Sequence, residues 1–221
     1  MDLYEVMRTT FSAREFHDEP VDDATLSRIF ENARFAPSGG NRQGWHVIVV
    51  RDQQTKDALS ELNVPAAKRY IAQVQAGENP LNTVHPTKVD EATIAETKPP
   101  RLLLEPVRRA PVVLVVTVDL GVVASSDAEL PRVGVISGAS IYPFTWNLLL
   151  AARNEGLGGT ITTLAVAQEP EVQKLLGIPR HYAVAAVIPL GRPVKQLTKL
   201  RRKPVEEFVT LERFDGEAFG G

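Results

Sequence analysis

A short run rich in glycine and amide side chains has the clearest potential to bind a ligand. It reads Ala36-Pro-Ser-Gly-Gly-Asn-Arg-Gln-Gly-Trp45, and it follows a helical pattern and precedes an apolar one. Pro37 ends the helix because its ring removes a backbone donor, and the two adjacent glycines allow a sharp turn with bare N–H groups. Asn41 and Gln43 add amide donors and acceptors that suit the polar edge of a planar heterocycle. The run indicates either a heterocycle-binding loop or an ordinary turn between helix and strand.

Basic residues near both ends of the chain would together suit a phosphate group. Arg14 follows Ser12 by two positions, and a basic cluster spans Lys199–Lys203 near the C-terminus. Forked guanidinium groups assisted by hydroxyl donors bind a phosphomonoester well, so Arg202 would complete such a pocket if the tail folds back. The alternative is that these are solvated surface charges. The sequence leaves open which basic side chain of the cluster makes the contact: Lys199, Arg201 or Arg202.

Other catalytic chemistries lack the residues that they need. The chain has no cysteine, and its four histidines are scattered without metal-ligand spacing. The stretch Val133–Gly138 lacks the spacing of a nucleophilic serine turn, and the glycines at 156, 158 and 159 do not match a dinucleotide-binding turn. We therefore expect no metal site and no catalytic nucleophile.

Hydrophobic periodicity predicts the elements that position these residues. The helix at 133–154 is apolar nearly all round and is expected to be buried on every side, with Pro143 kinking it or marking its true start. The strand at 45–51 is apolar without alternation, which is typical of a strand covered on both faces. Asp22 is a good N-cap for the second helix. The expected helices lie at 2–10, 22–36, 53–62, 65–75, 133–154 and 169–176, and the expected strands at 45–51, 110–119 and 182–190.

The stretch from 77 to 106 breaks these patterns. It carries five prolines and many charges, so it is expected to be an excursion of the lid or arm type rather than part of the core. The composition, 43% apolar and 24% charged with a net charge of −2, is that of a globular protein with no electrostatic preference for nucleic acid or an anionic membrane. No apolar run is long enough to span a membrane, and the N-terminus does not resemble a signal peptide, so the expected location is the cytoplasm.

Four motifs in order resemble the FMN-dependent nitroreductase family. Thr10–Phe16 resembles the opening R-x-S-x-R/K-x-F motif, and Pro37–Trp45 resembles P-S-G-G-N-x-Q-P-W, with Gly44 where many members have proline. Asn147–Gly159 is similar to the family's interface helix and G-L-G exit, and Arg201–Glu207 to its closing R-x-P-L-E-E motif. Thr10 stands where the first arginine is expected, which leaves open whether Arg8 or Thr10 takes that place.

The resemblance implies an α+β fold, a three-layer sandwich with a central mixed, mostly antiparallel sheet flanked by helices, in an intertwined homodimer. It also implies one domain over 1–221, with a variable excursion at about 62–106 and a C-terminal arm from about 192. FMN would lie at the dimer interface. Its phosphate would contact Ser12, Arg14 and Arg202 of one chain. The flavin would be covered by the partner's loop, through Pro37, Ser38, Gly39, Asn41 and Gln43. Backbone N–H groups of Thr162, Thr163 and Leu164 would face its N5/O4 edge.

The implied activity is hydride transfer from NAD(P)H through flavin N5 to a nitroaromatic, a quinone or a similar conjugated acceptor. No side chain is expected to be catalytic, because the cofactor carries the chemistry. Two alternatives stay open. The chain could be a relative that consumes its flavin or reductively dehalogenates aromatic substrates, or a protein that binds or stores flavin without turnover.

Overall fold

A four-stranded sheet forms the centre of the protein. The structure, a computed structural model, describes residues 1–220, so Gly221 of the expected domain lies outside the described residues. The strand order is β1-β2-β4-β3, and the three pairs of neighbouring strands are antiparallel. One isolated parallel bridge joins Ser12 to Gly159. The predicted mixed, mostly antiparallel sheet is confirmed. The strands are β1 (Trp45–Val50), β2 (Val112–Asp119), β3 (Gly158–Gly159) and β4 (Tyr182–Gly191).

Strand β2 contributes to two hydrophobic cores, one on each face of the sheet. Val112, Leu114 and Val116 belong to the first core, while Val113 and Val115 belong to the second. Successive side chains of a strand point to opposite faces, so a strand covered on both sides must be apolar throughout. The unbroken Val/Leu run of β2 therefore follows from its central position.

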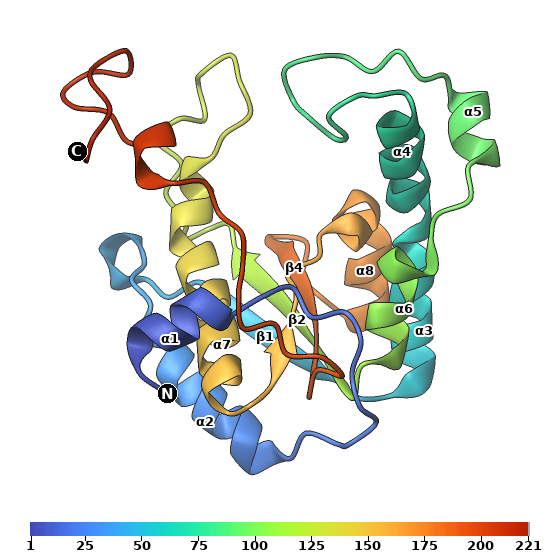
Figure 1. The fold of residues 1–221 in the computed structure, drawn as a ribbon. Coiled ribbons are helices and arrows are strands. Elements are labelled where there is room, and N and C mark those ends of the chain that lie inside the picture. Colours follow the sequence, from blue (N-terminus) through green and yellow to red (C-terminus); the bar gives the residue numbers. More distant parts are fainter. Residues whose placement is uncertain (221) are drawn as a thin grey trace.

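Helices cover both faces of this sheet (Figure 1), which confirms the predicted three-layer α+β sandwich. None of the helices in the described part of the chain combines the length and apolar composition needed to cross a membrane. One layer holds α1 (Leu3–Thr9), α2 (Asp23–Ala33) and α7 (Tyr142–Asn154). The other holds α3 (Gln53–Leu62), α4 (Val64–Gln75), α6 (Arg101–Arg109) and α8 (Glu169–Leu176), with α5 (Glu91–Glu96) outside α4. Short 3₁₀ turns are η1 (Gly39–Asn41), η2 (Ile136–Ser140), η3 (Leu164–Gln168) and η4 (Val205–Glu207).

Local sequence signals set several helix ends. The carboxylate of Asp22 accepts the Thr25 N–H at 2.6 Å, which confirms the predicted N-cap of α2. Asp52 caps α3 and Asp90 caps α5 in the same way. These caps satisfy donors that the first turn of a helix leaves unpaired.

Two expectations of complete burial are wrong for the single chain. Helix α7 begins at Tyr142, so Pro143 marks its start, and the preceding residues form η2. Tyr142 and Trp146 are 44% and 41% exposed, so α7 is not buried on every side. Strand β1 is an edge strand, and its His46 and Val49 are exposed.

The expectation for 77–106 is also wrong at its C-terminal end, because α6 belongs to the core. Pro106, inside this range, is buried in α6, and the next residue, Val107, is 1% exposed and lies in the second hydrophobic core. Pro100 acts as the N-cap residue, where its fixed φ fits, and Pro106 is tolerated inside the helix although it removes one backbone bond. Tertiary packing of α6 against α3 thus overrides the local helix-breaking signal.

We expect Gly159→Ala to destabilise the protein. A Cβ at this position would lie 2.8 Å from the Pro189 carbonyl oxygen and 3.1 Å from Leu149 Cδ2. Overpacking of this kind costs about 1–3 kcal/mol, which for a chain of this size lowers the melting temperature by about 3–10 °C. Thermal unfolding followed by circular dichroism measures the change.

The matched control is Gly134→Ala. Its Cβ would meet its nearest neighbour, Asp127 Oδ1, at 3.5 Å, an ordinary contact. Equal melting temperatures for the two variants would show that β3 can shift away from β4 without cost.

Candidate functional site

Backbone pairing places the Ser12–Arg14 segment beside the sheet. The Ala13 N–H donates to the Gly159 carbonyl at 3.1 Å. On the other side of the segment, the Val194 N–H donates to the Glu15 carbonyl at 3.1 Å, and the His17 N–H to the Arg192 carbonyl at 2.9 Å. The segment therefore lies between β3 and the chain that leaves β4, which fixes the position of Arg14.

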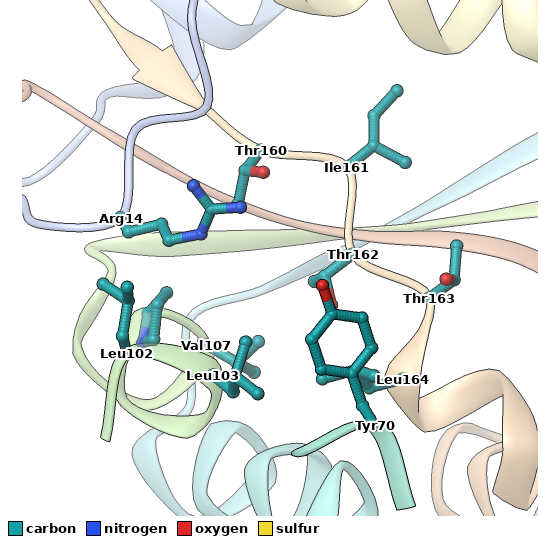
Figure 2. A pocket seen from close by; sticks show the side chains of 11 residues that line it. Arg14, Tyr70, Leu102, Leu103, Val107, Thr160, Ile161, Thr162, Thr163 and Leu164 are labelled. Carbon is teal, nitrogen blue, oxygen red and sulfur yellow. The ribbon is translucent and has the colours of Figure 1, made fainter. Parts of the chain in front are cut away.

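Arg14 and the chain after β3 line one cavity of about 200 Å³. Figure 2 shows the Arg14 side chain extending toward Thr160, with Thr162, Thr163 and Leu164 further along the same wall. The structure thus brings together four of the predicted site residues, Arg14 and Thr162–Leu164. Exposed Ser12 lies next to them through its bridge to Gly159.

The backbone donors of this wall differ in whether they are paired within the chain. The N–H groups of Thr163 and Leu164 have no hydrogen-bond partner within residues 1–220. The Thr162 N–H, by contrast, donates to the Val187 carbonyl at 3.0 Å. The expectation that Thr162 offers its N–H to a ligand is therefore wrong, because the pairing with β4 uses that donor.

The Pro37–Gln43 loop has a strained backbone held by internal hydrogen bonds, and it does not line this cavity. Gly40, Asn41 and Gln43 all have positive φ, at 61°, 52° and 51°, and such conformations in non-glycine residues are concentrated at functional sites. The Ser38 hydroxyl accepts the Gln43 N–H at 2.9 Å, and the Gln43 side-chain amide donates to Asn41 Oδ1 at 3.2 Å. None of the loop residues lines the Arg14 cavity.

The loop is attached to the α7 side of the sheet. The Gly39 N–H donates to the Ser140 hydroxyl at 3.1 Å, just before α7 begins. Figure 1 shows the loop on the same side as α1 and α7. Within one chain, the two groups of predicted site residues are therefore separate.

Arg202 also lies apart from Arg14 in the single chain. Its guanidinium donates to the neighbouring Arg201 carbonyl, and it does not line the Arg14 cavity. Closer to the N-terminus, the Thr10 hydroxyl is buried and donates to the Val6 carbonyl, while Arg8 lies over the Tyr4 ring. Neither Thr10 nor Arg8 lines the cavity.

The opposite wall of the cavity consists of residues that the sequence analysis missed. They come from α4 and α6, and Tyr70 points its hydroxyl toward Thr162 in Figure 2. The amphipathic pattern of α6 could have predicted part of this wall, but Pro100 and Pro106 indicated a break in the helix. The missed residues of this wall are Tyr70, Leu102, Leu103, Pro106 and Val107. Thr160 and Ile161, on the same wall as Thr162, were also missed.

Asp127 holds the segment that leads to Ser140, the residue whose hydroxyl binds the Pro37–Gln43 loop. This carboxylate is buried, accepts the Val135 N–H at 2.8 Å and pairs with Arg132 Nη1 at 2.7 Å. The Val135 N–H, and next the Arg132 guanidinium, lower the pKa of Asp127 to about 2. Asp127 therefore stays ionised and holds Val135 at the start of η2, which carries Ser140.

The chemistry of the Arg14 cavity is that of recognition rather than acid–base catalysis. The lining combines a cation, two residues whose backbone N–H groups are unpaired within residues 1–220, and apolar side chains, a set that suits the electron-rich edge of a planar heterocycle. The volume is below the 300 Å³ or so usual for a small-molecule site, so a second surface is needed to enclose a ligand of cofactor size.

A sheet covered by helices on both faces, with a cavity lined by Arg14 and the chain after β3, defines a ligand-binding α+β protein. The chain belongs to the nitroreductase family, whose family model matches residues 7–192. This match confirms the family that the four sequence motifs indicate.

Curated relatives cover nearly all of the chain. It is 30% identical over 208 residues to an NADH dehydrogenase of Thermus thermophilus, which spans 90% of each protein. It is also 26% identical over 216 residues to iodotyrosine deiodinase 1 of Pongo abelii, covering 95% of this chain and 68% of that protein.

Solved structures share the fold. An oxidised iodotyrosine deiodinase bound to FMN and 3-iodo-L-tyrosine superposes with a TM-score of 0.69 at 22% identity, covering 96% of this chain and all of the other. NfrA2 of B. megaterium gives a TM-score of 0.68 at 20% identity, covering 96% of this chain and 74% of the other.

We expect Asp127→Asn to lower stability at neutral pH and to flatten the acid side of the stability curve. The folded-state pKa of Asp127, about 2, lies below its ordinary value of 3.8. A depressed carboxyl pKa contributes stability above the unfolded-state value and loses it as pH falls through the folded-state value. The difference between wild type and variant should therefore be full above about pH 5 and should shrink between about pH 4 and 2. Urea unfolding at a series of pH values measures it.

Glu129→Gln is the control, because Glu129 is exposed in the same loop and makes no hydrogen bond or ion pair within residues 1–220. A stability difference between wild type and the Asp127→Asn variant that did not change with pH would contradict the linkage.

Proposed function

We propose that this protein is an FMN-dependent oxidoreductase that transfers hydride from NAD(P)H to a nitroaromatic, a quinone or a similar conjugated acceptor. The observation that carries the proposal is the convergence of Arg14 with the free N–H groups of Thr163 and Leu164 in one cavity. Membership of the nitroreductase family and the FMN-bound structural relative support it.

The residues of the cavity fit FMN in charge and in donor set. Ser12 and Arg14 provide a hydroxyl and a guanidinium, which suit a phosphomonoester or the polar ribityl and pyrimidine edge. The Thr163 and Leu164 N–H groups suit acceptor atoms of the flavin ring, such as O4 and N5. The site residues that remain apart in one chain are Pro37, Ser38, Gly39, Asn41, Gln43 and Arg202.

When bound, FMN would supply the hydride-transfer chemistry itself. The protein's part is to orient the ring against the wall after β3 and to limit water access. Arg14, held through its backbone neighbours, would bind the phosphate and so fix the cofactor's position in the cavity. The apolar side chains of Leu103 and Val107 line the wall opposite.

A second copy of the chain would supply what one chain lacks. The 200 Å³ cavity is small, and the strained Pro37–Gln43 loop faces away from it on the α7 side. Exposed Tyr142 and Trp146 on α7 provide apolar surface of the kind that obligate interfaces bury. We infer a homodimer in which the loop of one copy covers the cavity of the other.

Reductive dehalogenation of an aromatic substrate is the second candidate. Similarity to iodotyrosine deiodinases over nearly the whole chain favours it. Halide release from a halogenated phenol with reduced protein would distinguish it from reduction of a quinone or nitro group. A protein that only stores flavin would catalyse neither reaction.

The proposed function predicts a protein that is yellow as purified and that catalyses NAD(P)H oxidation. Absorbance bands are expected near about 370 and 450 nm, and the released chromophore should be FMN. Light scattering should give about twice the 24.2 kDa chain mass, because such subunits are not stable alone. NAD(P)H should be oxidised when menadione or a nitroaromatic is added. A protein that binds FMN but oxidises no NAD(P)H would instead support storage.

We expect Arg14→Ala to weaken FMN binding without unfolding the apoprotein. A charge-assisted contact to phosphate contributes roughly 1.5–3 kcal/mol, or about a 10- to 150-fold change in Kd. Riboflavin lacks the phosphate, so its Kd should change little. Flavin fluorescence quenching measures both ligands on both proteins.

Arg34→Ala is the matched control, since Arg34 is an exposed arginine just after α2 and does not line the cavity. Equal weakening of FMN and riboflavin would place Arg14 against the flavin ring instead of the phosphate. No change for either ligand would make Arg14 a solvated surface charge.

A further inference from the structure

A second cavity adjoins the proposed flavin site. Its volume is about 560 Å³, and it lies between α4, α5 and η3. Thr163 and Leu164 line both this cavity and the one that holds Arg14. A molecule whose reactive part reaches the free N–H groups of Thr163 and Leu164 would therefore extend its remaining part between α4 and α5.

The lining of this α4–α5 cavity combines apolar surface with three charged side chains. Lys68, Arg69 and Glu91 are the charged residues among its described lining, so the balance is one positive charge. The apolar part is formed by Val64, Pro65, Ala66, Leu81, Ile94 and Ala95. Such a lining suits a ring that bears one anionic group.

Arg69 and Glu91 form an ion pair that a ligand can replace. The Arg69 guanidinium donates to the Glu91 carboxylate, and the two side chains are 37% and 78% exposed. Ion pairs exposed to this degree contribute little net stability. Exchange of Glu91 for the carboxylate of a ligand would keep the charge-assisted hydrogen bond of Arg69 at little cost.

The attachment of α5 does not depend on this ion pair. Lys68 Nζ donates to the Ala95 carbonyl at 2.6 Å, and Ile94 of α5 is buried. The helix is also capped by Asp90. Arg69 can therefore change partner while α5 stays in place.

We propose that the α4–α5 cavity selects acceptors that carry a carboxylate or similar anionic group, with Arg69 as the specificity-determining residue and Glu91 as an internal competitor. This inference rests on the proposed oxidoreductase function and names the class of acceptor for it. Tyr70, the next residue on α4, lines the Arg14 cavity, so α4 contacts both parts of such a substrate.

The test compares an anionic ligand with a neutral one of the same size. Calorimetry measures binding of 4-nitrobenzoate and 4-nitrobenzamide to the FMN-loaded protein, and steady-state kinetics measures their KM. Arg69→Gln should raise Kd and KM for 4-nitrobenzoate about 3- to 10-fold, since a partly exposed charged hydrogen bond is lost. Glu91→Gln should lower both about 2- to 5-fold by removing the competitor. The values for 4-nitrobenzamide should change less than about twofold.

The opposite signs of the two variants separate recognition from structure. An ion pair that only holds α5 would make both variants weaken both ligands, and that result would overturn the proposal. Arg34→Gln, which removes an exposed arginine paired with Glu31 on α2, controls for net charge. A rise in the KM for NAD(P)H with unchanged 4-nitrobenzoate binding would assign Arg69 to the dinucleotide phosphate and would also overturn it.

Failure of the proposed function gives a different result. If wild type shows no NAD(P)H oxidation with either acceptor, the oxidoreductase proposal fails. The calorimetric comparison still decides whether Arg69 selects the anionic ligand.

Discussion

The candidate site depends on backbone pairing between segments from the two ends of the chain. Residues 12–17 are hydrogen-bonded to Gly159 on one side and to residues 192–194 on the other. The approach is close enough that a Cβ on Gly158 would lie 2.7 Å from Pro193 Cγ and 3.0 Å from Ala13 Cβ. Arg14 is exposed and makes only one hydrogen bond within the described residues, to the Ser12 carbonyl. Its position is therefore set by the backbone that carries it, and that backbone requires glycine in β3.

The sheet and most helices could be predicted from sequence because their signals are local. The Val/Leu run of β2, the Asp22 cap and the glycine after α8, at φ 67°, each act within a few residues. Helix α6 could not be predicted, because Pro100 and Pro106 signal a break. Its stability comes from partners distant in sequence, among them the Ser60 hydroxyl, which donates to the Leu104 carbonyl. Burial on both sides of β1 and α7 was overestimated, because periodicity shows that a surface is apolar but not what covers it.

Four of the eleven residues that line the Arg14 cavity could be predicted, and the division has a physical reason. Arg14 belongs to a short sequence motif, and the roles of Thr163 and Leu164 were implied by the family resemblance. Tyr70 and the α6 residues reach the cavity only through the packing of α4 and α6, which no local pattern encodes. The Thr162 N–H could not be judged from sequence either, because its pairing with Val187 is a tertiary contact. Which chain provides the Pro37–Gln43 loop is a question of assembly, and that part of the site stays a prediction.

The binding groups of the two cavities have different origins: backbone donors in the Arg14 cavity and side chains in the α4–α5 cavity. This difference affects which substrates members of the family can bind. The Arg14 cavity presents backbone donors just after β3, and the position of these donors depends on the path of the chain rather than on the side chains of Thr163 and Leu164. The α4–α5 cavity presents side chains on helices outside the sheet, and replacement of Lys68, Arg69 or Glu91 would alter its charge without disturbing β3 or β4. One cofactor site can thus coexist with different acceptor sites. This arrangement is consistent with relatives of this chain whose names range from NADH dehydrogenase to iodotyrosine deiodinase. The acceptor is therefore better inferred from α4 and α5 of this chain than from the identity of any relative.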